Sequence, residues 1–242
     1  MKNYTLFLWI ALLMLGISGT IGAREVASFN DGWEFKKGPF SKEALQAVQK
    51  WNSDWQEVSI PHTWNADDMQ KQASAFYEGV GYYRKKFTFP ENMEGKRIFL
   101  RFEGVGSYAE VYINGYLAGT HKGAYSAFAC EISSQVKFGK ENEIIVKADN
   151  SSRPDVIPTN HILFGVYGGI YRPVWLVVTE TCSIIANDCA SPGVYITQKN
   201  VSKKSAEVTV KVKVDNATLA PVPLELENAI YTPGEAQSFA MM

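Results

Sequence analysis

The chain has 242 residues, 46% of them hydrophobic and 13% aromatic, which is enough for one sizeable core or for one domain and part of another. Its 24 basic and 25 acidic residues give a formal net charge of −1, and they form no basic stripe. This charge pattern argues against nucleic acid as a partner.

Residues 1–23 have the three parts of a secretory signal peptide. Lys2 supplies a positive charge, Leu6 to Leu15 form an apolar run, and small residues follow up to Ala23. The run is too short for a membrane span, and no later segment approaches one. We therefore expect an exported chain, periplasmic or extracellular, whose mature form starts near residue 24 and has no membrane span.

Short apolar runs separated by turn signals follow as far as residue 181. Candidate strands begin at Trp33 and then run over Gln56–Ile60, Tyr82–Phe89, Lys96–Glu103, Tyr108–Ile113, Ser126–Ile132, Glu143–Asp149 and Ile170–Val178. Asn114-Gly115 is the favoured two-residue hairpin turn. A short helix is predicted over residues 41–50, with Ser41 as its N-cap. This pattern predicts an all-β fold, a β-sandwich or jelly roll, over residues 24–181.

The pattern changes after about residue 182. Residues 186–193 read as a linker, and valines alternate with polar residues over Ala206–Val214, as in a half-buried strand. This indicates a second β-sandwich of immunoglobulin type, which needs about 100 residues. Residues 190–242 supply fewer, so we expect this second domain to be incomplete.

Three cysteines and three histidines leave no recognisable metal site. The cysteines are Cys130, Cys182 and Cys189. Cys182 and Cys189 could pair across a short loop, and the alternative is three unpaired, mostly buried thiols. No spacing of Cys and His suggests zinc, so no metal and no cofactor are expected.

Five separated segments together resemble family 2 glycoside hydrolases. They read WNSDWQEVSIPHTWN (residues 51–65), EGVGYYRKKFTFP (78–90), FEGVGSYAEVYINGYLAGTHKGAYSAFACEIS (102–133), NEIIVKADNS (142–151) and LFGVYGGIYRPVWLVV (163–178). Their order and spacing fit the family as well. The resemblance covers roughly residues 33–178 and the start of the next domain.

The resemblance implies a galactose-binding-like jelly roll, followed by an immunoglobulin-like domain and a TIM barrel. Such enzymes are retaining β-galactosidases, β-glucuronidases and β-mannosidases, and two barrel glutamates about 5–5.5 Å apart do their chemistry. A barrel needs about 250 residues, and this chain ends before one could begin. We therefore expect no catalytic residue here. The dipeptide Asn142-Glu143 mimics the family's acid/base pair but reads as the polar start of a strand.

The resemblance also implies that loops of the jelly roll reach the rim of the sugar site. Sugar hydroxyls need planar donors and acceptors, and Asp155 and Asn160 are the best candidates in the loop 149–172. Relatives often have an acidic residue near Asn160, so the pattern of sugar contact differs here. Glu78 is a third candidate, with an exposed loop carboxylate as its alternative. Arg153 could clamp a sugar, or simply pair with Asp155.

The glycine pair Gly168-Gly169 interrupts an aromatic run before the last candidate strand. It would let a ligand-facing loop turn sharply into the sheet and keep the approach to a neighbouring domain open. Arg172 is expected to fix this turn, and Tyr171 and Trp175 to pack. His62 is expected to order its loop by hydrogen bonds.

Three functions remain open at this point. The first is the N-terminal, non-catalytic part of a β-galactosidase-like glycoside hydrolase that acts on terminal β-glycosides and needs the missing immunoglobulin-like and barrel parts as partners. The second is a stand-alone secreted carbohydrate-binding module or lectin-like protein. The third is an interaction scaffold without sugar binding.

Overall fold

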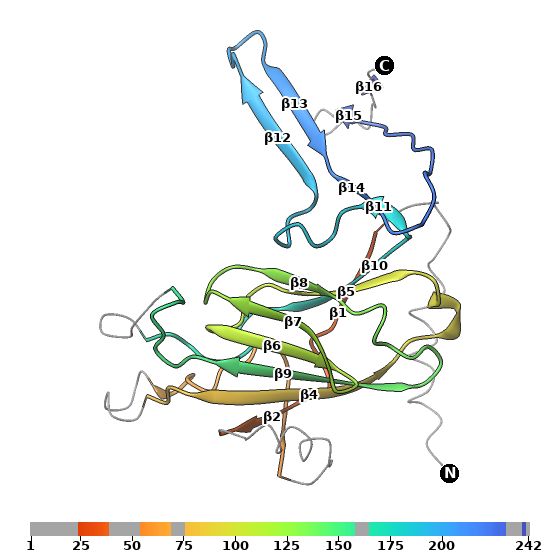
Figure 1. The fold of residues 1–242 in the computed structure, drawn as a ribbon. Helices are drawn as coiled ribbons and strands as arrows, with labels where there is room; N and C mark the ends of the chain where they lie inside the picture. The colour runs from red at the N-terminus through yellow and green to blue at the C-terminus, as the bar shows by residue number, and fades with distance from the viewer. Residues whose placement is uncertain (1–23, 39–53, 69–75, 158–164, 231–238, 241–242) are drawn as a thin grey trace, which may run out of the picture.

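The computed structural model describes residues 24–38, 54–68, 76–157, 165–230 and 239–240. These residues form two packed β-sheets and a smaller set of strands that projects from them (Figure 1). A short 3-10 helix, η3 (Glu91–Met93), joins two strands. The predicted all-β class is confirmed, whereas the helix predicted over residues 41–50 lies outside the described residues.

The larger sheet has six antiparallel strands in the order β3-β2-β4-β9-β6-β7. Their bounds are β2 (Trp33–Lys37), β3 (Gln56–Val58), β4 (Val80–Thr88), β6 (Tyr108–Ile113), β7 (Tyr116–Lys122) and β9 (Glu141–Asp149). The predicted strands of this sheet are therefore correct to within a few residues. β7 completes the hairpin that the turn at residues 114–115 predicts.

The smaller sheet has four antiparallel strands in the order β1-β10-β5-β8. Their bounds are β1 (Glu25–Ser28), β5 (Arg97–Phe102), β8 (Phe128–Glu131) and β10 (Val174–Thr179). β1 was not predicted, because only Val26 and Ala27 are apolar in its four residues. β10 begins four residues later than predicted, since Ile170 to Pro173 lie in the preceding loop.

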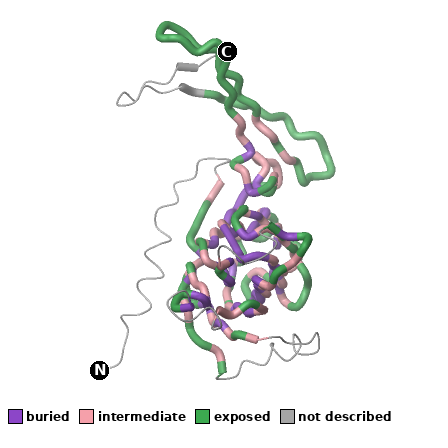
Figure 2. Tube along the Cα trace, turned by 90° about the vertical axis from the view of Figure 1, so that its left-hand side faces the viewer, coloured by how far each residue is buried: buried purple, intermediate pink, exposed green. Residues whose placement is uncertain are grey.

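One hydrophobic core fills the space between the two sheets. Strand alternation places every second side chain inside, as Ala109, Val111 and Ile113 show for β6, each fully buried. The aromatic side chains of Trp33 and Tyr83 belong to the same core. Figure 2 shows this buried region as the purple part of the tube.

The Asn114-Gly115 turn forms as predicted, with positive φ angles of 50° and 84°. The Asn114 side chain donates from Nδ2 to the Gln135 carbonyl (2.7 Å) and to Asn142 Oδ1 (2.8 Å). Asn142 is buried and donates to two backbone carbonyls of the preceding turn. The dipeptide Asn142-Glu143 is therefore the structural start of β9, as expected.

A second group of strands follows the sandwich. They are β11 (Cys182–Ile184), β12 (Val194–Lys199), β13 (Glu207–Val212), β14 (Val214–Asn216), β15 (Ala229–Ile230) and β16 (Phe239–Ala240). β11 pairs with β14, β12 with β13, and β15 with β16. On the sandwich side, Arg97 donates to Asp215 Oδ2 (2.8 Å), and Ala186 packs with Phe99 and Val177.

The long β-strand predicted over Ala206–Val214 is wrong in two respects. It is divided at Lys213, where the chain changes partner: the Lys213 N–H donates to the Gly193 carbonyl in the register of β12, and the Lys213 carbonyl accepts from the Ile185 N–H in the register of β11. Its apolar face is also not half-buried, because Val208 and Val210 are 43% and 41% exposed. The β12–β13 hairpin accordingly appears green in Figure 2.

Two further features bear on the expectations from sequence. Cys130, Cys182 and Cys189 are all free, so the pairing of Cys182 with Cys189 does not form. Among the described residues, no helix is both long and apolar enough to cross a membrane.

Candidate functional site

Several connections gather at one end of the sandwich, which we call the loop end (left in Figure 1). Asp149, the last residue of β9, pairs with Val80 at the start of β4 and with Tyr108 at the start of β6. Tyr108 also pairs with Lys122, the last residue of β7. The described parts of the connections at this end are residues 59–68 and 76–79 of the first, 103–107, 123–127, and residues 150–157 and 165–173 of the last. The loop that carries most of the predicted site residues is therefore placed beside three others.

Asn150 is the buried centre of the loop end. Its Nδ2 donates to Asn65 Oδ1 (3.3 Å) and to the carbonyls of Tyr77 (3.2 Å) and Val166 (2.8 Å). Its Oδ1 accepts a hydrogen bond from the Gly79 N–H (2.8 Å). One fully buried side chain thus joins two of these connections, because amides offer donors and acceptors in several directions.

Asn65 extends this network. Its Nδ2 donates to Asp68 Oδ2 (2.6 Å) and to the Tyr77 carbonyl (3.0 Å), and its Oδ1 accepts from the Gly168 N–H (2.8 Å). A buried polar group without partners costs about 1–3 kcal/mol, so this complete satisfaction fixes the loops. Neither asparagine was predicted from the sequence as an organising residue. Their signal was present in the segments ending HTWN and ADNS, but their partners lie far away in sequence.

The glycine pair lets the chain pass directly against the core. A Cβ added to Gly168 would lie 1.9 Å from Cζ2 of Trp64. A Cβ on Gly169, whose φ is +108°, would lie 2.3 Å from the Tyr83 hydroxyl and 2.7 Å from the His62 carbonyl. The sharp turn was predicted correctly. The expectation that the small side chains leave space for a neighbouring domain was wrong. A Cβ added to Gly168 or Gly169 would instead meet residues inside the same domain.

His62 and Tyr83 contact the glycine turn on its core side. The His62 N–H donates to the Ile170 carbonyl (2.8 Å), and its Nδ1 lies 2.7 Å from the Tyr83 hydroxyl. Burial lowers the pKa of His62 and raises that of Tyr83. Both groups are therefore neutral at pH 7, and His62 orders its loop by hydrogen bonds as expected.

Arg172 does not fix the glycine turn, contrary to expectation. Its side chain is exposed, and its guanidinium carbon lies 5.9 Å from the centre of the Tyr171 ring. Tyr171 instead donates a hydrogen bond from its hydroxyl to the Ala124 carbonyl, which ties this loop to the 123–127 connection.

Arg153 and Asp155 form a charged cluster at the rim of the loop end. Arg153 donates to Asp155 from Nε (3.1 Å) and Nη2 (3.4 Å), and Lys122 Nζ lies 2.6 Å from Asp155 Oδ2. Hydrogen bonds from Arg153, and then from Lys122, lower the pKa of Asp155. The Arg153 guanidinium also lies 4.6 Å above the ring of Tyr108. Of the two roles predicted for Arg153, the structure shows the pairing with Asp155.

Glu78 is exposed at the entry to β4, in the residue before Gly79. It lies on the same end of the sandwich as Arg153 and Asp155, because Val80 and Asp149 are paired. Asn160 lies outside the described residues. Two tyrosines of the loop end are open to solvent, with exposed fractions of 59% for Tyr125 and 40% for Tyr167.

The loop end combines groups that suit the recognition of hydroxyls. A paired arginine and carboxylate offer planar donors and acceptors, and the exposed tyrosines offer ring faces. Within the described ranges, no cluster of three or more His, Cys, Asp or Glu side chains has the geometry of a metal site.

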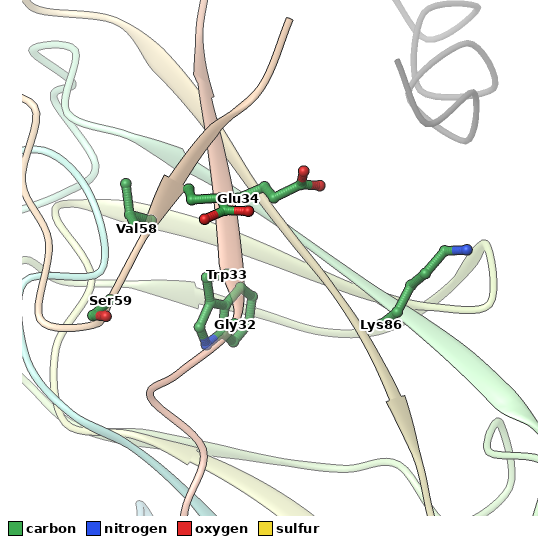
Figure 3. Close-up of a pocket in the computed structure, with 7 residues that line it drawn as sticks. Gly32, Trp33, Glu34, Val58, Ser59 and Lys86 are labelled. Atoms are coloured by element: carbon green, nitrogen blue, oxygen red, sulfur yellow. The ribbon is translucent and has the colours of Figure 1, made fainter. Parts of the chain in front are cut away.

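A cavity of about 560 Å³ lies away from the loop end, at the edge formed by β2 and β3 (Figure 3). It is lined by Gly32, Trp33, Glu34, Glu57, Val58, Ser59 and Lys86. Two of its charges already have partners, since Arg84 Nε donates to Glu34 (2.7 Å) and Lys86 pairs with Glu141 (2.8 Å). None of the residues predicted for the site lines it.

Comparison with known proteins places the sandwich in a described family. The domain described as "Glycosyl hydrolases family 2, sugar binding domain" matches residues 26–180. A β-glucuronidase of Bacteroides fragilis is 37% identical over 89% of this chain, and a β-galactosidase of Thermoanaerobacter pseudethanolicus is 32% identical over 79%. The chain spans 29% and 25% of those proteins.

Solved structures agree with this comparison. The crystal structure of a putative β-galactosidase from Bacteroides fragilis is 65% identical, with a TM-score of 0.83 over 90% of this chain and 33% of that one. The Bacteroides uniformis β-glucuronidase is 33% identical, with a TM-score of 0.74 over 80% of this chain and 22% of that one. The matched part of these relatives is their N-terminal region.

Proposed function

The chain belongs to glycoside hydrolase family 2, and from that premise we propose that its loop end forms part of the sugar subsite of a β-glycosidase. In this proposal the chain is the N-terminal, non-catalytic portion of the enzyme. It binds and positions terminal β-glycosides, whereas residues outside the chain cleave them. The observation that carries the proposal is the gathering of Arg153, Asp155 and Tyr108 on loops fixed by the Asn65–Asn150 network.

Each part of the cluster has a chemical role in this proposal. The Arg153 guanidinium and the Asp155 carboxylate can each make two hydrogen bonds to neighbouring hydroxyls once they exchange part of their mutual pairing. Because both side chains are substantially exposed, that pairing is worth little by itself. We place Glu78 and Asn160 at the same rim as further hydroxyl contacts.

We also propose that residues 1–23 direct export and that residues 190–242 contribute to an immunoglobulin-like domain. The apolar run after Lys2 supports the first proposal. The antiparallel β12–β13 hairpin with exposed Ile196 and Val210 supports the second, because such a face is completed by further strands.

The test is a chimera in which this chain replaces the matching segment of the Bacteroides fragilis β-glucuronidase. We expect the chimera to hydrolyse an aryl β-glycoside and the purified chain alone to be inactive. The substitution Asp155→Asn should raise KM several-fold and change kcat less, since it removes a ground-state contact. Lys140→Gln, an exposed change outside the loop end, is the matched control.

Two results would contradict the proposal. If an active chimera with both Asp155→Asn and Arg153→Gln had an unchanged KM, the loop end would not be part of the sugar subsite. Hydrolysis by the purified chain, abolished by a substitution of one of its own residues, would show that catalysis resides within it. Strong binding of methyl β-D-galactopyranoside to the chain alone would favour a self-sufficient binding module.

A further inference from the structure

A separate cavity of about 240 Å³ lies on the outer face of the four-stranded sheet. One wall is the sheet, and the other is the connection that follows β11. The lining residues are Arg24, Val26, Arg101, Glu103, Trp175, Val177, Ala186 and Ser191. Side chains alternate along β10. Val174 and Leu176 face the core between the sheets, so Trp175 and Val177 point outward.

Two arginines give this cavity a positive character. Arg24 is held in place by hydrogen bonds from Nη2 to the carbonyls of Ile184 (3.1 Å) and Ile185 (2.8 Å). Its pKa is lowered by burial and then by the positive charge of Arg101. Glu103 offsets one charge only in part, through a 3.4 Å contact with Arg101 Nη2. Two cations and one anion leave the lining with a net positive charge.

Arg101 also has an unused hydrogen-bond donor. Its Nε is buried and has no hydrogen-bond partner among the described residues. Buried donors without partners are rare in folded proteins. An acceptor in the adjacent cavity reaches this donor only when the partly exposed Arg101 side chain turns toward it. The planar fork of a guanidinium matches a carboxylate better than it matches a neutral hydroxyl.

The rest of the lining is apolar and small. Trp175 offers an aromatic wall, and Val26, Val177 and Ala186 complete it. The volume lies below the range of about 300–1,000 Å³ that is typical of drug-sized ligands. A single ring with one acidic group therefore suits the cavity better than an oligosaccharide.

We propose that this cavity binds a small ring-bearing carboxylate of the sugar-acid class, with its carboxylate on Arg101 and its ring against Trp175. The site lies on the outer face of the four-stranded sheet, and Glu103, in the 103–107 connection, is the lining residue that it shares with the loop end. It joins the sandwich to the connection at residues 184–193, and its occupation therefore stabilises that junction.

Isothermal titration of the purified chain with sodium D-glucuronate tests the proposal. We expect saturable binding at one site and none with D-glucose, which has no carboxylate. Arg101→Lys keeps the charge but removes the planar fork and Nε, and should weaken binding at least tenfold. Trp175→Leu should weaken it as well. Lys140→Gln, an exposed change away from both sites, should leave it unchanged.

Each other outcome overturns the proposal in a recognisable way. No saturable binding would refute it, and equal binding of glucose would refute recognition of the carboxylate. Sulfate binding as tight as glucuronate binding would refute the ring contact. Loss of glucuronate binding in Arg153→Gln but not in Arg101→Lys would assign the ligand to the loop end, which tests the proposed function separately.

A measurement on the unaltered protein covers the case in which a variant does not fold. Phenylglyoxal modifies accessible arginines, and peptide mass spectrometry reports each one. Glucuronate should protect Arg101 at least threefold, and protection of Arg153 alone would assign the ligand to the loop end. Equal rates at Arg101 with and without glucuronate would contradict the proposal.

Discussion

Replacing Gly168 by alanine should destabilise the sandwich through a single contact. The added Cβ would lie 1.9 Å, 2.2 Å and 2.7 Å from three atoms of the Trp64 ring. That ring is 8% exposed and stacks on Phe35 with centroids 5.7 Å apart, so it has little room to move. Overpacking of this kind typically costs about 1–3 kcal/mol. We expect a value at the upper end, about 2–3 kcal/mol, because the obstacle is a rigid ring in a packed core.

The assay is urea unfolding followed by circular dichroism. Gly95→Ala is a stringent comparison: an added Cβ there would meet no atom within 4 Å, but the φ of +88° adds a backbone strain that Gly168, whose φ is not positive, does not have. A larger cost at Gly168 than at Gly95 therefore reports the steric contact. A second background, Trp64→Leu, makes room for the new methyl group, so Gly168→Ala should cost about 1–2 kcal/mol less there than in the native chain.

Two results would refute this reasoning. If Gly168→Ala cost no more than Gly95→Ala, the close approach to Trp64 would not govern the loop. If its cost were the same in the Trp64→Leu background, the two residues would not be coupled.

Three further predictions concern buried polar and charged groups. Asn150→Asp loses the Nδ2 donors and buries a charge, so it should cost at least about 3 kcal/mol in urea unfolding, whereas the exposed change Asn92→Asp should be nearly neutral. Hydrogen bonds from Arg97 lower the pKa of Glu131 from its ordinary value of 4.5. The ionised Glu131 therefore stabilises the folded chain above pH 4.5, and this stabilisation is lost as the pH falls through the lowered pKa. Glu131→Gln should flatten the decline in the free energy of unfolding measured between about pH 6 and pH 3. Burial lowers the pKa of Lys85 from 10.5 to about 8. Between these two pH values the unfolded chain binds more protons than the folded chain, so the free energy of unfolding should rise with pH. Lys85→Met should abolish that rise, and a rise that persists in the variant would contradict the assignment to Lys85.

Local sequence patterns predicted the sheets well, because strand alternation and turn chemistry act over a few residues. The Asn114-Gly115 turn needs two positive φ angles, and this dipeptide adopts them at little cost. Tyr108–Ile113 was predicted with its bounds correct, since its apolar residues alternate strictly. β1 carries no such pattern and depends on pairing with β10.

The organisation of the loop end was not predictable in the same way. The contact between Asn65 and Asn150 joins residues 85 positions apart, and nothing local marks either as buried. The alternation at Val208 and Val210 did indicate a strand, but burial of that face needs neighbours beyond those described. Arg153 and Asp155 illustrate a third case: the sequence left pairing and sugar contact open, and the structure shows the pairing.

The buried position of Asn150 has a consequence for how the protein is produced. Asn150-Ser151-Ser152 is an acceptor sequence for N-linked glycans. A glycan on Nδ2 would replace one of the two N–H donors that serve Val166 and Asn65 and would not fit a side chain with no exposed surface. In a eukaryotic secretory host, where acceptor sites are modified before folding is complete, a fraction of chains would be unable to close the loop end. Bacterial expression, or Ser152→Ala in a eukaryotic host, avoids that fraction.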